Sequence, residues 1–433
     1  MGCAKNLVDS ENMIGLLKEQ DFPMVSRLEE AEIAIVNTCG FIQSAVEESV
    51  DTILEVAAHK KMGKLERLFV VGCFVQRYGY KLRKEIPEVD GWLGTGELLK
   101  IVDMLAEESG SYPSFFINKP TFLADHSVPR IRATPFYSAY LKIAEGCSHK
   151  CSYCTIPRLR GPLRSRDLAS LIIEAENMVG SGVKEINLIA QDTTMYGKDL
   201  GQANCLEDLL GRLLQIGGIE WIRILYGHPL RISDRLLELM DGEEIICPYL
   251  DIPLQHVNEN ILKAMGRNYK GESPLQLIER IRSGRRHVSL RTTVMVGFPG
   301  ETDEIFDELY HFVETAQFDH LGAFIFNPEK GTPAARLKGI VERDVARKRL
   351  ETIMALQAEI SLNKNRRMID RVERVLIEGV SPETDLLLRG RTATMAPDVD
   401  SQVLINRGQG NVGKIVPVLI KEAHPYDLIG EII

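Results

Sequence analysis

The chain has 433 residues, of which 44% are hydrophobic, and its formal net charge is -9 at pH 7. Two or three domains with separate cores fit this length, and the acidic balance argues against nucleic-acid binding by bulk charge, although a local basic patch is compatible with it. The sequence contains neither an apolar run of about 18 residues nor a signal-like N-terminus, which favours a cytoplasmic protein with no membrane span. Its eight cysteines are therefore expected to be metal ligands or buried thiols.

Residues 1–125 are predicted to form an α/β domain. The expected elements are a helix capped by Asp9 or Ser10 and continuing through Glu19, a strand at 33–36, a helix from about Ile42 and a strand at 68–71. This alternation predicts an α/β sandwich whose strands end in loops along a common edge.

Residues 133–367 are predicted to form a partial parallel barrel. Six apolar strands recur with helices between them, at 140–144, 185–190, 221–226, 249–253, 290–296 and 321–326. Six βα units indicate a barrel open on one side, with its chemistry at the C-terminal strand ends. A charged helix over 343–366 then leads out of the barrel.

Residues 368–433 are predicted to form a small five-stranded β-barrel, because short β runs alternate with glycine-rich turns. The runs lie at 372–378, 386–389, 403–406 and 414–420. This segment has seven Lys and Arg against ten Asp and Glu, which gives it a net charge of 7 - 10 = -3.

Cys147, Cys151 and Cys154 follow the first predicted barrel strand with the spacing Cys-x3-Cys-x2-Cys. Three thiolates in one tight loop suit three irons of a cubane cluster, and the fourth iron is left open for a reactant. The alternative is structural zinc, which takes four ligands, typically from paired cysteines. No second pair follows at the expected distance, and His149 could supply only a cramped fourth ligand.

This loop, opened by Gly146 and carrying Tyr153 before its last cysteine, resembles the signature of the radical S-adenosylmethionine (SAM) enzymes. The resemblance implies a 4Fe-4S cluster on the three cysteines, with the amino and carboxylate groups of SAM on the fourth iron. Reduction would cleave SAM to methionine and a 5'-deoxyadenosyl radical, which can abstract hydrogen from an unactivated carbon.

Cys3, Cys39 and Cys73 are too far apart in sequence for one loop. Cys39 and Cys73 each close an apolar strand, and strand ends on one sheet edge are neighbours in space. The three thiolates could converge on a second iron-sulfur cluster with one open iron; alternatively, each is a small buried hydrophobic residue. Cys205 and Cys247 are expected to be core or helix-start residues.

The local contexts Gly2-Cys3-Ala4-Lys5-Asn6, Asn37-Thr38-Cys39-Gly40-Phe41 and Val71-Gly72-Cys73 resemble the cluster-ligand motifs of the methylthiotransferase family. The domain order resembles that family over essentially the whole chain. It implies an N-terminal methylthiotransferase domain, a radical SAM barrel and a terminal TRAM barrel. It also implies that the second 4Fe-4S cluster, on Cys3, Cys39 and Cys73, delivers sulfide or methylthio to a carbon radical, and that a second SAM supplies the methyl group.

Four further stretches, 142–147, 156–161, 190–197 and 251–256, are most similar to the branch that modifies the β-carbon of an aspartate in small-subunit ribosomal protein twelve. The tRNA-adenosine branch has a similar layout but usually carries Gly-Gln-Asn where Ala190-Gln191-Asp192 stands. TRAM domains often bind RNA, but an acidic one better suits a basic ribosomal protein.

A non-catalytic iron-sulfur or ribosome-binding protein is the remaining alternative. The implied partners are an electron donor, such as flavodoxin or ferredoxin, and a sulfur donor.

Barrel position suggests four SAM contacts: Tyr153 near adenine, Gln191, Arg291 and the turn 297–300 with Gly297. Each has a structural alternative, which is packing for Tyr153, helix capping for Gln191, a carboxylate pair for Arg291 and backbone geometry for the turn. Arg158 and Arg160 are expected to form a solvated basic loop rather than contact phosphate or substrate.

The family resemblance also implies a β-strand before the Gly-Cys-x-Lys-Asn motif, whereas this sequence starts at Met1-Gly2-Cys3. Without that strand, we expect the N-terminal sheet to lack one element and Cys3 to lack an anchor.

Overall fold

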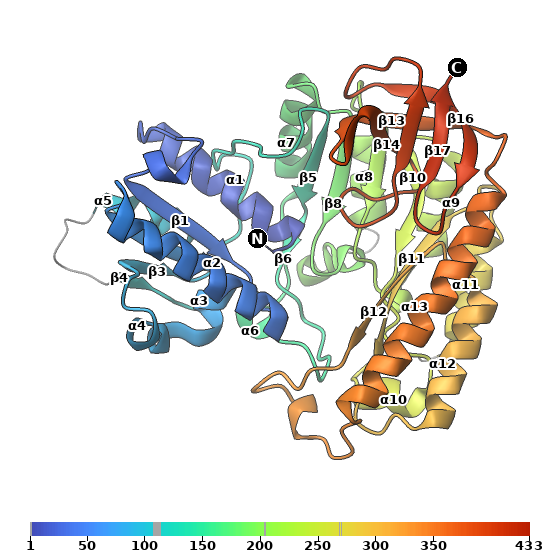
Figure 1. The fold of residues 1–433 in the computed structure, drawn as a ribbon, viewed down its shortest axis with the longest axis horizontal. Coiled ribbons are helices and arrows are strands. Elements are labelled where there is room, and N and C mark those ends of the chain that lie inside the picture. The colour runs from blue at the N-terminus through green and yellow to red at the C-terminus, as the bar shows by residue number, and fades with distance from the viewer. Residues whose placement is uncertain (1, 107–113, 203–204, 268, 270) are drawn as a thin grey trace.

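The computed structural model of the chain consists of three parts that follow one another along the sequence (Figure 1). It describes residues 2–106, 114–202, 205–267, 269 and 271–433. Within these ranges, no helix combines the length and the apolar character that a membrane span requires.

The N-terminal part is a parallel sheet with helices on both faces, as expected. Its strands are β1 (Ile33–Thr38), β2 (Arg67–Gly72), β3 (Gly91–Leu93) and β4 (Ser114–Phe116), in this order, and its helices are α1 (Ala4–Glu19), α2 (Gln43–Met62), α3 (Cys73–Tyr78), α4 (Leu82–Glu85) and α5 (Ile101–Ala106). Successive side chains of a strand point to opposite faces. Leu68 and Val70 accordingly pack in one cluster with residues of α2 and α3, whereas Phe69 and Val71 pack with residues of α1 and α5.

Asp9 and Ser10 do not cap the first helix, so that prediction was wrong. Helix α1 begins at Ala4, and Cys3 occupies the N-cap position without a side-chain capping bond. Ser10 lies inside the helix and its hydroxyl donates to the Asn6 carbonyl (3.2 Å), while Asp9 pairs with residues of the central part. The sequence favoured Asp9 and Ser10 because cysteine is a poor capping residue.

The central part is an open sheet of six parallel strands, which confirms the predicted partial barrel. The strands are β5 (Ser138–Lys142), β8 (Glu185–Ile189), β9 (Trp221–Ile224), β10 (Ile246–Asp251), β11 (Ser289–Val296) and β12 (His320–Ile325), with β5 and β12 at the edges. The helices are α6 (Ile156–Arg160), α7 (Leu168–Gly180), α8 (Cys205–Leu213), α9 (Asp234–Gly242), α10 (Glu259–Ala264), α11 (Pro274–Arg282), α12 (Asp303–Ala316) and α13 (Arg343–Arg366). The first strand ends at Lys142 rather than Ala144; β6 (Ala144–Glu145) pairs instead with β7 (Arg164–Ser165).

The C-terminal part is a closed five-stranded barrel, also as predicted. Its strands are β13 (Val372–Ser381), β14 (Thr384–Thr392), β15 (Val403–Arg407), β16 (Ile415–Ala423) and β17 (Leu428–Ile432), in the spatial order β13-β14-β15-β17-β16. The fifth strand, β17, is the one that the sequence patterns did not locate. Closure pairs every strand on both sides and leaves no open sheet edge.

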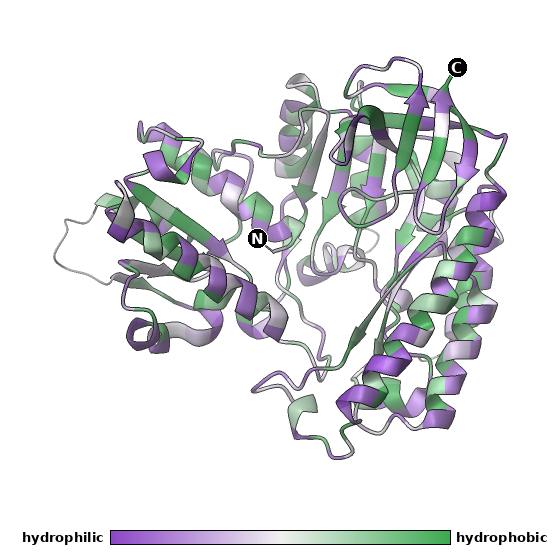
Figure 2. Cartoon of the chain, viewed as in Figure 1, coloured by the Kyte–Doolittle hydropathy of each residue, from purple (hydrophilic) through white to green (hydrophobic). Residues whose placement is uncertain are grey.

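The two end domains contact opposite ends of the central strands. Glu185 and His320, the first residues of β8 and β12, bond to the C-terminal barrel, whereas Lys142, the last residue of β5, pairs with Asp9 of α1. One hydrophobic cluster around Tyr249 contains residues of α1 and of the β14–β15 connection. Figure 2 shows the central strands as mostly hydrophobic and α12 and α13 as mixed, as expected for strands covered by helices.

Candidate active site

The loop cysteines (Cys147, Cys151 and Cys154) lie between β6 and α6, at the carboxyl end of the central strands. Backbone bonds fix the loop, because the Cys147 amide donates to the Gly161 carbonyl (3.0 Å) and the Ser152 amide to the Met265 carbonyl (2.8 Å). The Ile156 amide also donates to the Cys154 sulfur at 3.4 Å. All three cysteine residues are half-buried, as suits a cofactor that must still meet a substrate.

Gly146 determines how this loop begins. Its φ is +76°, and a Cβ at this position would lie 2.1 Å from the Pro162 carbonyl oxygen. Only glycine fits such a conformation and such a close approach. The glycine therefore lets the loop fold back tightly against residues 161–162.

The thiols of Cys147 and Cys154 are protonated at neutral pH when no metal is bound. Burial raises the pKa of Cys147 to about 11 and that of Cys154 to about 12, so metal binding must displace their protons. In the described ranges, no three His, Cys, Asp or Glu side chains are placed to share one metal ion. A cubane cluster differs in that each thiolate binds its own iron, so its ligands stand further apart.

The dispersed cysteines (Cys3, Cys39 and Cys73) are brought together by the N-terminal fold. Cys3 precedes α1, Cys39 follows β1, and Cys73 follows β2 as the first residue of α3. An ideal Cβ on Gly2 would lie 3.4 Å from the Cys39 Cβ, so the segment before α1 lies beside the end of β1. The chain thus gathers three thiols at one edge of the sheet, as the strand-end argument predicted.

A second glycine makes this convergence possible. Gly72 has a φ of +99°, and a Cβ there would lie 2.7 Å from the Thr38 carbonyl oxygen. Because Gly72 has no side chain, the ends of β1 and β2 can approach one another closely. The residues that follow them, Cys39 and Cys73, are thereby placed side by side.

The dispersed thiols have different electrostatic surroundings. Burial raises the pKa of Cys73 to about 11, against the effect of the Arg160 guanidinium, and the neighbouring Cys3 and Cys39 add to the rise. Desolvation would also raise the pKa of Cys3, but Lys5, Arg160 and backbone amides of α1 outweigh it and lower this pKa. A helix N-terminus beside two cations favours a thiolate at Cys3.

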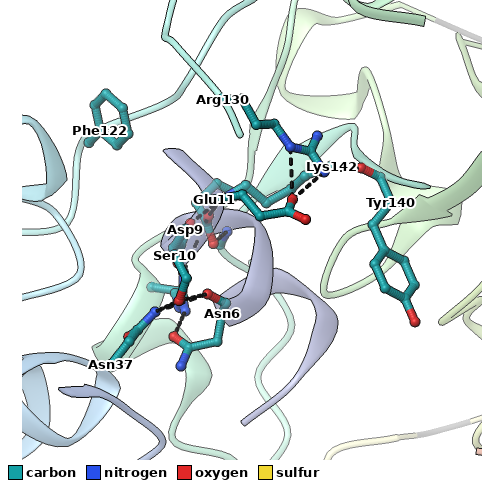
Figure 3. A network of polar contacts seen from close by, with 12 residues as sticks. Asn6, Asp9, Ser10, Glu11, Asn37, Phe122, Arg130, Tyr140 and Lys142 are labelled. Carbon is teal, nitrogen blue, oxygen red and sulfur yellow. Dashed lines mark hydrogen bonds and ion pairs between the residues drawn. The ribbon is translucent and has the colours of Figure 1, made fainter. Parts of the chain in front are cut away.

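A buried ion network lies between the N-terminal domain and the central barrel. This carboxyl-end network consists of Asp9, Lys142, Glu145 and Arg160, all at most 8% exposed. Lys142 Nζ lies 2.5 Å from Asp9 Oδ1 and 2.8 Å from Glu145 Oε2, and Arg160 Nη1 lies 2.5 Å from Asp9 Oδ2. Figure 3 shows Asp9 on α1 together with Lys142 on the barrel side.

Arg160 is therefore not part of a solvated loop, and that expectation was wrong. Helix α6 directs Arg160 into the gap between two domains, where carboxylates from both compensate its charge. Arg158, two residues earlier, is exposed and donates to the Gly331 carbonyl at 2.9 Å, in line with the expected basic surface. Helical spacing alone places the two arginines on different faces.

The carboxyl-end network touches both sets of cysteines. Arg160 Nε donates to the Cys73 sulfur at 3.3 Å. Glu145 Oε1 accepts from the Gly146 amide (3.3 Å), next to Cys147, and from Gln191 Nε2 (3.0 Å). The loop cysteines and the dispersed cysteines thus lie on two sides of one network.

Further bonds hold α1 in this position. Asn37 Nδ2 donates to the Asn6 carbonyl (2.9 Å) and to Ser10 Oγ (2.8 Å), and Arg130 Nη2 lies 2.6 Å from Glu11 Oε2 (Figure 3). Asn37 belongs to β1, and Arg130 precedes the first barrel strand. Polar bonds therefore join α1 to both domains, independently of any cluster.

Gln191, a predicted SAM contact outside the cysteine loop, bonds to Glu145 next to Gly146. It follows β8 by two residues and donates to Glu145, while its own Oε1 is buried and has no hydrogen-bond partner in the described ranges. A buried acceptor without a partner is uncommon, and a ligand donor would satisfy it. The amino group of SAM is such a donor, and the role of Gln191 as a SAM contact stays a prediction.

Tyr153 packs in a hydrophobic cluster with Met265 and Phe298, and its hydroxyl accepts from Arg267 Nη1 at 3.3 Å. Burial raises its pKa well above the usual value, so the hydroxyl stays protonated. These contacts agree with the packing alternative, and an adenine contact for Tyr153 stays a prediction.

Arg291 and Gly297 make contacts that favour their structural alternatives. Arg291 pairs with Asp400 of the C-terminal barrel and donates to the Val399 carbonyl at 3.1 Å. A Cβ on Gly297 would lie 2.7 Å from the Ala346 Cβ of α13, which shows a close helix contact. Their role as SAM contacts stays a prediction.

Several residues around the site were not identified from the sequence. Lys142 lies inside the apolar stretch 139–144 and Glu145 directly follows it, and this was a usable signal, because buried charges are normally paired. Asp9 gave no comparable signal. Cys205 and Cys247 are buried, at the start of α8 and within β10, as predicted.

Comparison with known proteins supports the three-part reading. Residues 1–94 match Uncharacterized protein family UPF0004, residues 141–313 match the Radical SAM superfamily, and residues 369–433 match the TRAM domain. A solved radical S-adenosylmethionine methyltransferase, TsrM from Kitasatospora setae, has the same fold over 74% of this chain and 70% of its own, with a TM-score of 0.55 and 15% identity.

Two curated relatives match the whole chain. The ribosomal protein uS12 methylthiotransferase RimO of Pelobacter propionicus is 48% identical over 433 residues, covering 100% of this chain and 96% of the relative. RimO of Geobacter sulfurreducens is also 48% identical, covering 100% and 97%. SAM and two 4Fe-4S clusters are the cofactors of such enzymes. The chain therefore belongs to the ribosomal protein uS12 methylthiotransferase family within the radical SAM superfamily.

Proposed function

We propose that this chain methylthiolates the β-carbon of an aspartate in the ribosomal protein uS12. In this proposal the loop cysteines hold one 4Fe-4S cluster and the dispersed cysteines hold the second. The domains divide at 1–125, 133–367 and 368–433. The relatives' printed names, which specify uS12, support the substrate.

The observation that carries the proposal is the placement of both cysteine sets on one buried network. Arg160 donates to the sulfur of Cys73, and Glu145 accepts from the amide of Gly146 beside Cys147. When bound and reduced, a 4Fe-4S cluster with SAM supplies a radical that takes hydrogen from an unactivated carbon. In the proposal, the second set of thiols, on the other side of the same network, holds the sulfur that must join the same carbon.

The chain's own residues position the two halves of this site. The carboxyl-end network and the α1 contacts fix the N-terminal domain against the barrel, so the distance between the cysteine sets is set before any substrate binds. Gln191 offers a buried oxygen to the SAM amino group. Such positioning supplies much of the rate of an enzymatic reaction.

The acidic C-terminal barrel supports a basic protein partner. Its net charge of -3 is the wrong sign for neutralising phosphates and the right sign for attracting a ribosomal protein. The remaining partners we propose are an electron donor such as flavodoxin or ferredoxin and a sulfur donor. A ribosomal substrate places the reaction in the cytoplasm.

Iron analysis tests the cluster assignment. Iron and sulfide content with Mössbauer spectra should show two clusters in the wild type and one in Cys3→Ala/Cys39→Ala/Cys73→Ala. This variant should still cleave SAM to 5'-deoxyadenosine but form no methylthio product, whereas Cys147→Ala/Cys151→Ala/Cys154→Ala should lose SAM cleavage. If the first triple variant keeps all its iron, the assignment of the dispersed cysteines is wrong.

The substrate is tested in a deletion strain. Mass spectrometry should show that uS12 loses its methylthio group and that tRNA keeps its own. Loss from tRNA alone would instead assign the chain to tRNA-adenosine modification. Absence of 5'-deoxyadenosine from reconstituted wild-type protein with dithionite and SAM would show a non-catalytic protein.

A further inference from the structure

We propose that Lys5 binds the side-chain carboxylate of the substrate aspartate and so selects this residue for modification. The inference rests on the proposed function, because it takes an aspartate of uS12 as the target. Lys5 lies in the first turn of α1, two residues after Cys3.

Lys5 is a buried cation without a carboxylate partner. The residue is only 9% exposed, and its Nζ lies 3.5 Å from the centroid of the Tyr226 ring. In the described part of the chain, no aspartate or glutamate forms an ion pair with this ammonium. Burying a charge is costly unless it is paired, so an unpaired buried lysine indicates a missing anion.

The neighbouring carboxylates do not supply this anion. In the carboxyl-end network, the two cations Lys142 and Arg160 are matched by the two carboxylates Asp9 and Glu145. Asp251, near the Tyr226 backbone, accepts from the Tyr226 amide at 3.3 Å and lies 3.9 Å from Arg291 Nε. Among the described residues, Lys5 therefore has no carboxylate within ion-pair distance; the anion beside it is the Cys3 thiolate, which binds the second cluster in the proposed function.

Tyr226 is held in an unusual conformation beneath Lys5. It lies two residues after the end of β9 with a φ of 62°, a left-handed value that is strained for a tyrosine. The Asp251 side chain accepts its amide, and its carbonyl accepts from the Thr193 amide at 3.0 Å. Strain of this kind persists where surrounding structure enforces it and is concentrated at functional sites.

The location of Lys5 suits the chemistry at an aspartate β-carbon. The carboxylate carbon is bonded directly to that β-carbon, so an ammonium that holds the carboxylate also fixes the reacting carbon. Lys5 stands beside Cys3 of the dispersed set and at the same barrel end as the loop cysteines. An adenosine has no carboxylate, so a site built around Lys5 discriminates between the two substrate classes of this chemistry.

The test compares peptides from uS12 that contain either the target aspartate or asparagine in its place. Binding to the reconstituted full-length protein is measured by fluorescence anisotropy, and methylthiolation by mass spectrometry. Wild type should prefer the aspartate peptide roughly 30-fold, since removing one partner of a buried charge pair costs at least this much. Lys5→Met should bind both peptides equally weakly, and Lys5→Arg should retain part of the preference.

Lys18→Met is the matched control, because Lys18 lies on the same helix but is exposed. It should keep the full preference for aspartate. Iron and sulfide content of each variant shows whether both clusters are still assembled.

The proposal is overturned if Lys5→Met prefers the aspartate peptide as strongly as the wild type does. It is also overturned if this variant loses affinity for SAM, or iron from the second cluster, without changing the preference. Failure of wild type to modify the aspartate peptide would reject the proposed function itself.

Discussion

Two buried ion networks join the central barrel to its neighbours, one at each end of its strands. The amino-end network consists of Glu185, Arg223, Glu378 and Arg391, in which Arg391 pairs with both carboxylates and Arg223 lies 3.3 Å from Glu185. The carboxyl-end network likewise has two cations and two carboxylates. The cysteine beside the amino-end network is the buried Cys247, whereas the six candidate cluster ligands and Lys5 lie beside the carboxyl-end network.

This difference indicates that the amino-end network has a structural role, whereas the carboxyl-end network also has a functional one. At the amino end, the charges compensate one another, and Arg223 Nη1 also donates to the Ala393 carbonyl at 2.8 Å. At the carboxyl end, Gln191 Oε1 has no hydrogen-bond partner and the Lys5 ammonium, which lies over the Tyr226 ring, has no ion-pair partner in the described residues. Charged groups that are paired with one another fix domains, whereas groups without such pairs at the carboxyl ends of strands are available to ligands.

The largest effect on stability is expected for Arg391→Met. The change leaves Glu185 with only Arg223 and removes the cation paired with Glu378, so we expect a loss of about 3–5 kcal/mol. Urea denaturation followed by Trp221 fluorescence in a Trp92→Phe background would measure it, because Trp221 lies beside Arg391. Arg374→Met, at an exposed position of the same barrel, should change stability by less than about 0.5 kcal/mol. Equal effects of the two variants would contradict the structural role of the amino-end network.

A somewhat smaller loss of folding stability is expected at low pH, through Glu185 of the amino-end network. Burial would raise the pKa of Glu185, but Arg391 and Arg223 outweigh it and hold the pKa at about 2. The folded value lies below the unfolded one, so the stabilisation is present above about pH 4.3 and is lost as the pH falls towards 2.

The loss should be roughly 3 kcal/mol. Urea midpoints at a series of pH values for the wild type and Glu185→Gln would isolate it, since other carboxylates titrate in both proteins. If the two curves fall in parallel, Glu185 is not the group responsible.

The smallest of the three effects on stability is expected for Arg160→Met. Asp9 and Glu145 both keep Lys142, at 2.5 and 2.8 Å, so the loss should be about 1.5–3 kcal/mol. Trp92 fluorescence in a Trp221→Phe background follows the N-terminal domain. The same variant should lose methylthiolation, although its stability is less affected than that of Arg391→Met.

Arg158→Met is the control for this variant, because Arg158 is exposed on the same short helix. It should leave stability within about 0.5 kcal/mol of the wild type. Retained methylthiolation in Arg160→Met would remove the functional distinction between the two networks.

Local patterns were sufficient for most of the fold. The six central strands follow from their apolar runs, and the helix Arg343–Arg366 has the predicted bounds. The start of α1 was misjudged because its N-cap, Cys3, is held by surroundings and not by a capping side chain. Strand β17 was missed because its short run pairs only after the chain returns to β15 and β16.

The residues of the site likewise divide into those that local sequence predicted and those that depend on contacts far apart in the chain. The loop cysteines were identifiable because ligands within eight residues depend on local backbone geometry, and Gly146 marks the turn that the loop needs. The burial of Arg160 could not be predicted, because Asp9, 151 residues earlier in the chain, supplies its carboxylate. Arg291 was assigned by strand position alone, and no local pattern indicated that Asp400 would pair with it.

The sequence by itself determined the parts: a cysteine loop after a barrel strand, three further cysteines at strand ends, and three domains in order. Only the tertiary structure decided how these parts face one another. It placed Arg160 on Cys73, Glu145 beside the loop cysteines and Lys5 over the Tyr226 ring, with no ion pair to the described residues. The physical reason is that spacing and periodicity encode backbone conformation, whereas charge pairing across a domain boundary depends on groups far apart in the chain.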